Sequence, residues 1–220
     1  MASGPRTIRS QTTETSAWMD LTKESKKLWF ASGNKGKLRE YRGLALAAGR
    51  VLQLELLPGF AEITEFEEKA PTFAENAVGK ALYYGKHAKG LLFADDSGLV
   101  VPAIGGAPGV LSARFAGPGA SNEEKIEKLL GEMRGKLGPE RSAYFVCVIA
   151  LVKEGRPVAV VSEKVDGEIL EAPRGSGGFG YDPVFYFPAL GKSFAELDEE
   201  QKNVHSHRGK AFRRLLEFLN

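Results

Sequence analysis

The order of apolar and polar residues divides the first part of the chain into short elements. The run LWFAS, residues 28–32, is typical of a strand and ends at a Gly-Asn turn. Apolar residues then recur at helical spacing, at Leu38, Tyr41, Ala45 and Ala48. The stretch VLQLELLP alternates as a strand does, and an acidic, irregular segment, FAEITEFEEKAP, follows it. This order predicts strand, loop, helix and strand.

The middle of the chain continues the alternation of helices and strands. Thr72 and Glu75 form a capping box that predicts a helix over TFAENAVGKALYYGKHA. The run LLFADDSGLVV predicts a strand broken by a polar turn, and GGAPGVLSARFAG predicts an ordered loop. Ser121 and Glu124 predict the start of the next helix by the same capping pattern.

The last third contains two long strand candidates and a terminal helix. SAYFVCVIALV and RPVAVVSEKVDGEI are separated by the turn sequence of residues 153–155, which predicts a hairpin. HRGKAFRRLLEFL carries its apolar residues on one helical face. We therefore expect an α/β fold, a mixed central β-sheet flanked by helices, in a single domain over residues 27–220. Residues 1–26 are polar and rich in Ser and Thr, and we expect a disordered extension there.

Composition narrows the classes of function. The chain has 220 residues, 43% hydrophobic and 26% charged, as ordinary globular proteins do. A formal net charge of +2 argues against non-specific nucleic-acid binding. No apolar run reaches the ~18 residues of a membrane span, so we expect no membrane partner. The single cysteine, Cys147, lies within an apolar run and favours a buried thiol in a reducing, cytoplasmic setting.

The stretch GSGGFGYDP, residues 175–183, matches the dinucleotide-binding pattern G-x-G-x-x-G. That pattern has meaning only where a helix opens on its last glycine. Here Tyr-Asp-Pro and the aromatic run VFYFP follow, which do not start a helix. The glycines therefore need another explanation.

The stretch SGNKGK is a candidate phosphate-binding loop. It lies between a predicted strand end and a predicted helix start, where backbone N–H groups and the positive end of the helix dipole are exposed. It is not a P-loop, because its spacing does not fit G-x-x-x-x-G-K-[ST]. The alternative is a simple turn with solvated lysines. The candidate ligands are all six residues, Ser32, Gly33, Asn34, Lys35, Gly36 and Lys37.

The stretch ADDSG is a candidate site for a hard cation. Asp95 and Asp96 end an apolar run, and Mg²⁺ prefers oxygen ligands held on rigid elements. Because side chains alternate along an extended chain, the two aspartates point to opposite faces. The alternative is an Asx turn that ends the strand. Glu67 and Glu68 are the nearest candidates for a second carboxylate ligand, or else belong to a solvated acidic loop.

The stretch KNVHSHR precedes the terminal helix. Lys202, His207 and Arg208 are hydrogen-bond donors suited to base carbonyls or phosphate. His205 and His207 are two residues apart without a cysteine nearby, a poor pattern for zinc.

In this order, SGNKGK, TFAENA, FADDSGLVVPAIGGAPGVLSARFAG, GSGGFGYDP and EEQKNVHSHRGKA closely resemble the inosine triphosphate pyrophosphatase family, the dITP/XTP pyrophosphatases. The resemblance covers about residues 28–219. It implies a two-lobed fold with the nucleotide site in the cleft between the lobes. It also implies a homodimeric, Mg²⁺-dependent hydrolase that converts non-standard purine nucleoside triphosphates, XTP, ITP and dITP, to monophosphate and pyrophosphate.

The resemblance also implies roles for individual residues. Asp96 falls on the catalytic acid and metal ligand, and Glu68 on a metal-ligand position of some members. Residues 32–37 fall on the triphosphate loop. The remaining implied substrate contacts are Ser97, Phe179, Gly180, Tyr181, Asp182, Lys202, His207 and Arg208.

Two residues depart from the family's pattern. Ser32 replaces the common Thr and keeps the hydroxyl, whereas His205 replaces an apolar residue. The N-terminal extension is also longer than is usual. Two other functions stay open on the residues alone: hydrolysis of modified pyrimidine triphosphates, and a nucleotide sensor without catalysis.

Overall fold

A computed structural model describes residues 27–48 and 52–219, so the predicted extension over residues 1–26 lies outside the described residues. Within them, one seven-stranded sheet runs in the order β2-β1-β3-β4-β5-β6-β7. β1 pairs in parallel with β2 and β3, and the other neighbours are antiparallel. The predicted α/β fold around a mixed sheet is confirmed.

The elements follow the predicted order closely. The strands are β1 Lys27–Phe30, β2 Gln53–Leu56, β3 Leu91–Val100, β4 Ser142–Lys153, β5 Arg156–Ile169, β6 Phe185–Phe187 and β7 Lys192–Ser193. The helices are α2 Lys35–Ala47, α3 Phe73–Gly85, α4 Asn122–Glu132, α5 Glu199–His205 and α6 His207–Phe218. Short 3₁₀ turns connect them, among which η4, Gly109–Arg114, lies in the predicted ordered loop. The short helix α5 was not expected as a separate element.

The prediction that a polar turn breaks ADDSG is wrong. β3 is continuous through this segment, and Asp95 and Asp96 pair in register with Ile149 and Val148 of β4. The antiparallel partner supplies hydrogen bonds to the backbone, so the Asx turn that the aspartates could form does not compete. The expectation that Asp95 and Asp96 face opposite sides follows from this extended backbone and agrees with their partners.

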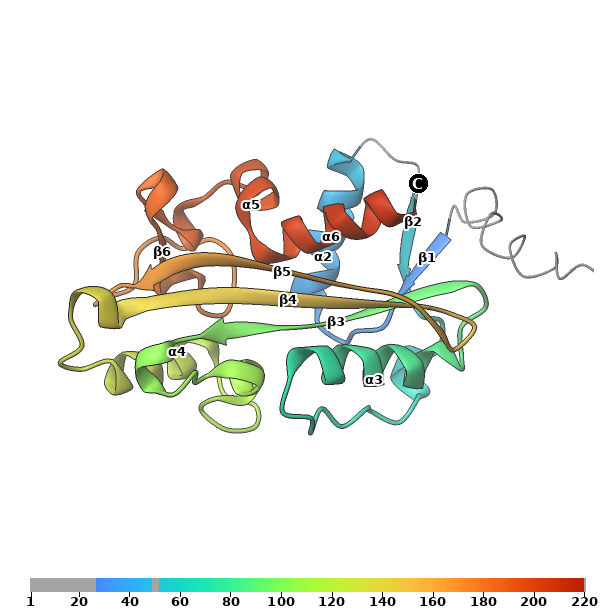
Figure 1. Ribbon diagram of the computed structural model, residues 1–220, viewed down its shortest axis with the longest axis horizontal. Helices are drawn as coiled ribbons and strands as arrows, with labels where there is room; N and C mark the ends of the chain where they lie inside the picture. Colours follow the sequence, from blue (N-terminus) through green and yellow to red (C-terminus); the bar gives the residue numbers. More distant parts are fainter. Residues whose placement is uncertain (1–26, 49–51, 220) are drawn as a thin grey trace, which may run out of the picture.

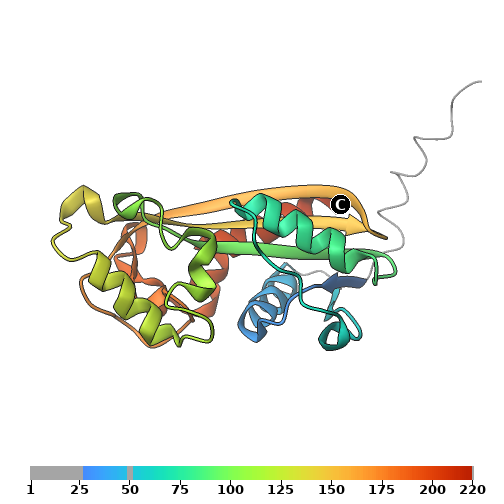
Figure 2. The same cartoon turned by 90° about the horizontal axis from the view of Figure 1, so that it is seen from below.

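Helices cover both faces of the sheet (Figure 1). On one face, α2 and α6 pack with the strands into a core that contains Phe30, Phe93 and Phe212. α3 covers the other face, where Ala81 and Val148 are among the core residues. Seen from that side, α3 and α4 cover different stretches along the length of the sheet (Figure 2).

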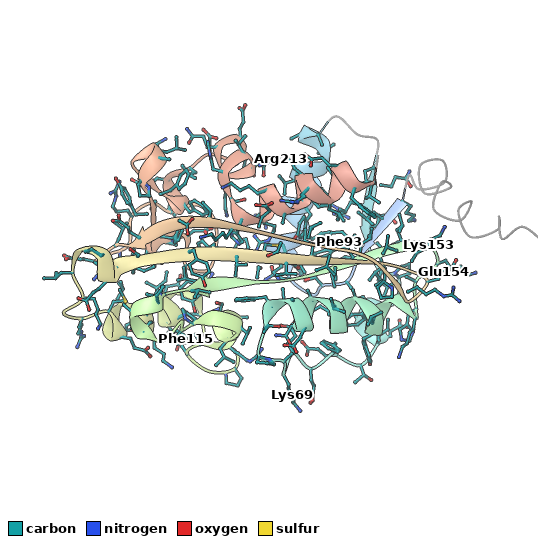
Figure 3. The ribbon with its side chains drawn as sticks, in the orientation of Figure 1. Lys69, Phe93, Phe115, Lys153, Glu154 and Arg213 are labelled. Carbon is teal, nitrogen blue, oxygen red and sulfur yellow. The ribbon has the colours of Figure 1, made fainter. Side chains whose placement is uncertain are left out.

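A third cluster lies at the far end of the long strands. α4, β6 and the ends of β3, β4 and β5 contribute to it, and Phe145, Phe185 and Phe194 are among its aromatic residues. β4 therefore contributes to all three clusters, with Cys147 and Val148 facing opposite sides. The predicted hairpin between β4 and β5 turns at Glu154 and Gly155, which both have positive φ, at the far right of Figure 3. In the described part of the chain, none of the helices is long and apolar enough to cross a membrane.

Candidate active site

The candidate site lies where β1 stops and β3 continues. Phe30, the last residue of β1, is in register with Phe93, whereas β3 runs on to Val100. The predicted phosphate loop leaves β1 at this point and leads into α2. The loop therefore lies beside the segment of β3 that carries Asp95 and Asp96.

Asn34 organises the phosphate loop. Its backbone N–H donates to the Ser32 hydroxyl at 3.1 Å, and its side-chain oxygen accepts from the Lys37 N–H at 3.0 Å. Asn34 is thus the N-cap of α2, and Lys35, Gly36 and Lys37 form the first turn. Gly33, Asn34 and Lys35 are exposed. The first turn of a helix presents unpaired N–H groups with the dipole's positive end, so this loop can bind an anion.

Asp95 faces the side of the sheet that α2 and α6 cover. Its carboxylate forms an ion pair with Lys37 at 2.9 Å and lies 3.9 Å from the Arg208 guanidinium. The Ser97 hydroxyl, which accepts from Arg208 at 3.1 Å, is 3.4 Å from the same Asp95 oxygen. Arg208 also pairs with Glu40. The structure therefore brings together the predicted residues Lys37, Ser97 and Arg208.

Asp96 faces the opposite side, toward α3. Its Oδ1 accepts from the Ser97 N–H at 3.0 Å, while its buried Oδ2 has no hydrogen-bond partner among the described residues. Lys80 of α3 donates to the Asp95 carbonyl at 2.9 Å and pairs with the Glu68 carboxylate. Glu68 and Asp96 thus share one charged environment on this face.

The two aspartates have opposite pKa shifts. Burial raises the pKa of Asp96 to about 6; Lys80 opposes this shift and the Glu68 carboxylate adds to it. Burial also acts to raise the pKa of Asp95, but Lys37, Arg208 and Lys80 outweigh it and hold that pKa below its ordinary value. Asp95 is therefore a fixed anion, whereas Asp96 can exchange a proton near neutral pH.

The glycine-rich loop closes the other side of the site. Asp182 holds it, because its Oδ2 accepts from the Phe179 N–H at 2.8 Å and from Lys202 at 2.7 Å. Gly178 has φ +71°, and the Asp182 carboxylate occupies the space of a Cβ there. The ring of Phe179 lies 5.0 Å from Lys202 Nζ and 5.2 Å from Arg208 Cζ. The glycines thus form a tight turn that presents an aromatic ring beside two cations.

The phosphate loop and the glycine-rich loop meet in space. A Cβ added to Gly36 would lie 3.4 Å from the Phe179 ring. Lys202 pairs with both Glu40 of α2, at 2.6 Å, and Asp182, at 2.7 Å. Segments far apart in the sequence therefore contribute to one largely buried charged cluster.

Two predicted contacts face into the protein. Tyr181 is buried, and its hydroxyl donates to the Ser112 carbonyl at 2.9 Å. His207 stacks on Phe145 with ring centroids 4.7 Å apart, and burial, together with nearby cations such as Arg208, lowers its pKa well below the ordinary value. Gly180 adopts positive φ in the same loop. Tyr181 and His207 support the loop and the start of α6 from behind.

Sequence reasoning missed Glu40 and Lys80. Lys80 follows Asn76 by four residues on the face of α3 that also buries Ala77 and Ala81, so a polar pair interrupts an apolar stripe. Glu40 follows Lys37 by three residues and therefore shares its face of α2. Polar and charged residues at helical spacing were the signal available in the sequence.

The residues present fit a magnesium ion. Mg²⁺ is commonly bound by one or two carboxylates together with water and substrate phosphates. Glu68 and Asp96 supply two carboxylates, and the unpartnered Asp96 Oδ2 has lone pairs free to donate to a metal ion. Over residues 27–48 and 52–219, no group of three or more His, Cys, Asp and Glu side chains is arranged to hold a metal ion.

Two open surface hollows lie elsewhere. One, of about 450 Å³, is lined by residues such as Tyr144 and Pro188, and the other, of about 560 Å³, by Tyr83 and His87 among others. Neither is lined by the charged residues described above. We assign the chemistry to the charged site because catalysis depends on charge and donors more than on hollow volume.

A known protein family matches most of the chain. The sequence model of the Ham1 family matches residues 28–218, which include every residue of the site. The chain belongs to the Ham1 family. Together with the curated relatives named dITP/XTP pyrophosphatase, this match confirms the family predicted from the sequence motifs.

Curated relatives and solved structures support the assignment over most of the chain. The chain is 49% identical to the dITP/XTP pyrophosphatase of Geobacillus kaustophilus over 86% of this chain and 92% of the relative. It is 50% identical to that of Thermus thermophilus, over 87% and 90%. A HAM1 protein from Coxiella burnetii superimposes with a TM-score of 0.77 at 39% identity, over 88% of this chain and 98% of that one. The Staphylococcus aureus Ham1 protein gives a TM-score of 0.76 at 38% identity, over 88% and 97%.

Proposed function

We propose that this Ham1 family member hydrolyses non-standard purine nucleoside triphosphates, namely XTP, ITP and dITP, to the monophosphate and pyrophosphate. The observation that carries the proposal is the meeting of the phosphate loop with Phe179, beside Asp95 and Asp96. An anion site and an aromatic ring flanked by cations are what the two ends of a nucleotide require. The curated relatives named dITP/XTP pyrophosphatase support this substrate class.

The reaction breaks one phosphoanhydride bond. The oxygen of a water molecule attacks the α-phosphorus, the bond from that phosphorus to the bridging oxygen breaks, and pyrophosphate leaves with the electron pair. Asp96 accepts the proton of the water. Lys37, together with the N–H groups at the start of α2, neutralises the triphosphate.

Mg²⁺ is the proposed cofactor, held by Glu68 and Asp96. When bound, it supplies charge neutralisation and polarises phosphate oxygens. Lys80 pairs with Glu68 and so keeps this carboxylate beside β3. Asp95, held as an anion by Lys37 and Arg208, orients the phosphate-binding lysine rather than accepting the proton.

The base end accounts for substrate choice. Phe179 stacks on the purine, and Lys202 and Arg208 donate toward the 6-keto oxygen of hypoxanthine or xanthine. The amino group of adenine would leave those donors unpaired, which costs binding energy.

The free, buried Cys147 and the absence of a membrane-spanning helix among the described residues support a cytoplasmic location. We also propose that the protein is a homodimer in the cytoplasm.

A substrate panel with Mg²⁺, scored by the released product, tests the proposal. We expect ITP, dITP and XTP to yield pyrophosphate, and ATP and pyrimidine triphosphates to react far more slowly. Asp96→Asn should lower kcat about 100- to 10,000-fold while nucleotide still binds. The matched control is Asp166→Asn, which removes an exposed carboxylate that pairs with Lys164 away from the site.

Other products would point to other functions. Release of single phosphates would contradict the proposal and indicate a phosphatase. Preference for modified pyrimidine triphosphates would show that these, and not purine triphosphates, are the substrates. Tight ITP binding without turnover would indicate a nucleotide sensor.

A further inference from the structure

The segment that carries Glu68 has no helix or strand of its own. Residues 64–70 are irregular, and side chains of α3 form hydrogen bonds with their backbone. Asn76 binds Ala70 twice, accepting from its N–H at 3.0 Å and donating to its carbonyl at 3.2 Å. The Tyr84 hydroxyl accepts from the Phe66 N–H at 3.1 Å. We call residues 64–70 the acidic segment.

Arg114 holds the acidic segment from a different element. Its guanidinium Nη2 donates to the Glu68 carbonyl at 2.6 Å, and it lies at the end of η4, 46 residues along the chain. Lys69, which follows Glu68 in the sequence, and Phe115, which follows Arg114, both lie on the side of the sheet that α3 and α4 cover (Figure 3). Glu68 is thus held at two points, its carboxylate by Lys80 and its carbonyl by Arg114.

η4 is itself fixed to both functional parts of the site. The Ser112 hydroxyl accepts from the Leu99 N–H of β3 at 2.9 Å and donates to the Gly109 carbonyl at 2.7 Å. The Ser112 carbonyl accepts from the Tyr181 hydroxyl of the glycine-rich loop at 2.9 Å. η4 therefore connects the strand that carries Asp96 with the loop that carries Phe179, and Arg114 extends this connection to Glu68.

We propose that Arg114 is a positioning residue that fixes the Glu68 backbone so that the Glu68 and Asp96 carboxylates are spaced for one divalent cation. The proposal rests on the metal role of Glu68 in the proposed function. Mg²⁺ demands a strict ligand geometry. Groups that hydrogen-bond to a ligand residue, without binding the metal themselves, affect metal affinity strongly. An irregular segment has no backbone ladder to set that spacing, so side chains must set it.

The test compares Arg114→Met, Arg114→Lys and Glu68→Gln in the full chain. Arg141→Met is the matched control, because Arg141 also donates to backbone carbonyls, such as those of Ile169 and Leu170, at a place away from the site. The first measurement is the affinity for Mn²⁺, followed by electron paramagnetic resonance in the presence of α,β-methylene-ITP. The second is amide hydrogen exchange over residues 66–70 without any metal. Thermal unfolding of each variant reports on its folding.

We expect Arg114→Met to weaken Mn²⁺ binding about tenfold or more and to speed exchange in the acidic segment. Arg114→Lys should recover part of the affinity, because an ammonium group can still donate one hydrogen bond to the Glu68 carbonyl. The apparent Mg²⁺ requirement of turnover should rise, while kcat at saturating Mg²⁺ stays close to the unsubstituted value. Arg141→Met should leave Mn²⁺ affinity and exchange in this segment unchanged.

Three results would overturn the proposal in different ways. Unchanged Mn²⁺ affinity in Arg114→Met, with weakened affinity in Glu68→Gln, would remove the role of Arg114 alone. Equal losses in Arg114→Met and Arg141→Met would show general destabilisation instead of positioning. Unchanged affinity in Glu68→Gln would show that Glu68 is not a metal ligand, and the inference would fail together with that part of the proposed function.

Discussion

Neighbouring residues can have opposite chemistry when a strand places them on opposite faces. Asp95 and Asp96 differ in their partners because one faces Lys37 and Arg208 and the other faces Lys80 and Glu68. The sequence alone predicted the opposite faces through strand alternation, but not the resulting pKa difference. That difference depends on charges brought from α2, α3 and α6, whose positions only the fold determines.

At the residue scale, we predict that the lowered pKa of buried His207 makes the free energy of unfolding depend on pH. Its folded pKa lies well below 6.5, so below about pH 6.5 the unfolded chain binds a proton that the folded chain does not. Stability should therefore fall as pH decreases, relative to His207→Gln, by at most about 1.4 kcal/mol per pH unit. Urea unfolding of both proteins between pH 7.5 and about pH 5 measures the difference. The opposite shift of Asp96 is common to both proteins and cancels. A constant difference across this range would contradict the buried neutral imidazole.

At the scale of elements, the start of α2 does two things at once. Asn34 caps the helix and, by doing so, orients the N–H groups proposed to bind phosphate. Asn34→Ala should cost about 1 kcal/mol of stability and also raise KM for ITP about tenfold, since the amides lose their fixed direction. Chemical denaturation and steady-state kinetics measure the two effects.

Ser121→Ala is the matched control for this cap. Ser121 caps α4 with a full capping box, far from the phosphate loop along the chain. It should lose similar stability with KM unchanged. Equal changes of KM in both variants would show that helix stability, and not the phosphate loop, sets the affinity.

Elements with strong local signals were predicted well, and those that depend on pairing were not. The N-cap at Thr72, the capping box at Ser121 and the hairpin turn at Glu154 and Gly155 lie where local sequence rules put them. The unbroken β3 was missed because Asp and Ser favour turns locally, and only the pairing with β4 overrides that preference. Arg114 was missed because its partner is a backbone carbonyl, which leaves no trace in the sequence.

At the scale of the whole molecule, β4 connects the three hydrophobic clusters. Phe145 belongs to the cluster at the far end of the sheet, while Cys147 and Val148 belong to the clusters on its two faces. Because all three clusters pack against β4, unfolding of this strand in one cluster would disrupt side-chain packing in the other two. We therefore expect residues 27–220 to unfold as one cooperative unit.

Two core substitutions at opposite ends test that expectation. Phe185 lies in the far cluster and Phe30 beneath α2, and both are fully buried. Phe185→Leu and Phe30→Leu should each cost about 1 kcal/mol or more, and in a cooperative unit every probe must report the same loss. The probes are far-ultraviolet circular dichroism and the fluorescence of Trp29 in β1, in a Trp18→Phe background that leaves Trp29 as the emitting tryptophan. If Phe185→Leu moved the dichroism transition and left the Trp29 transition in place, the two ends would unfold separately, and the nucleotide site would lie between two independent units.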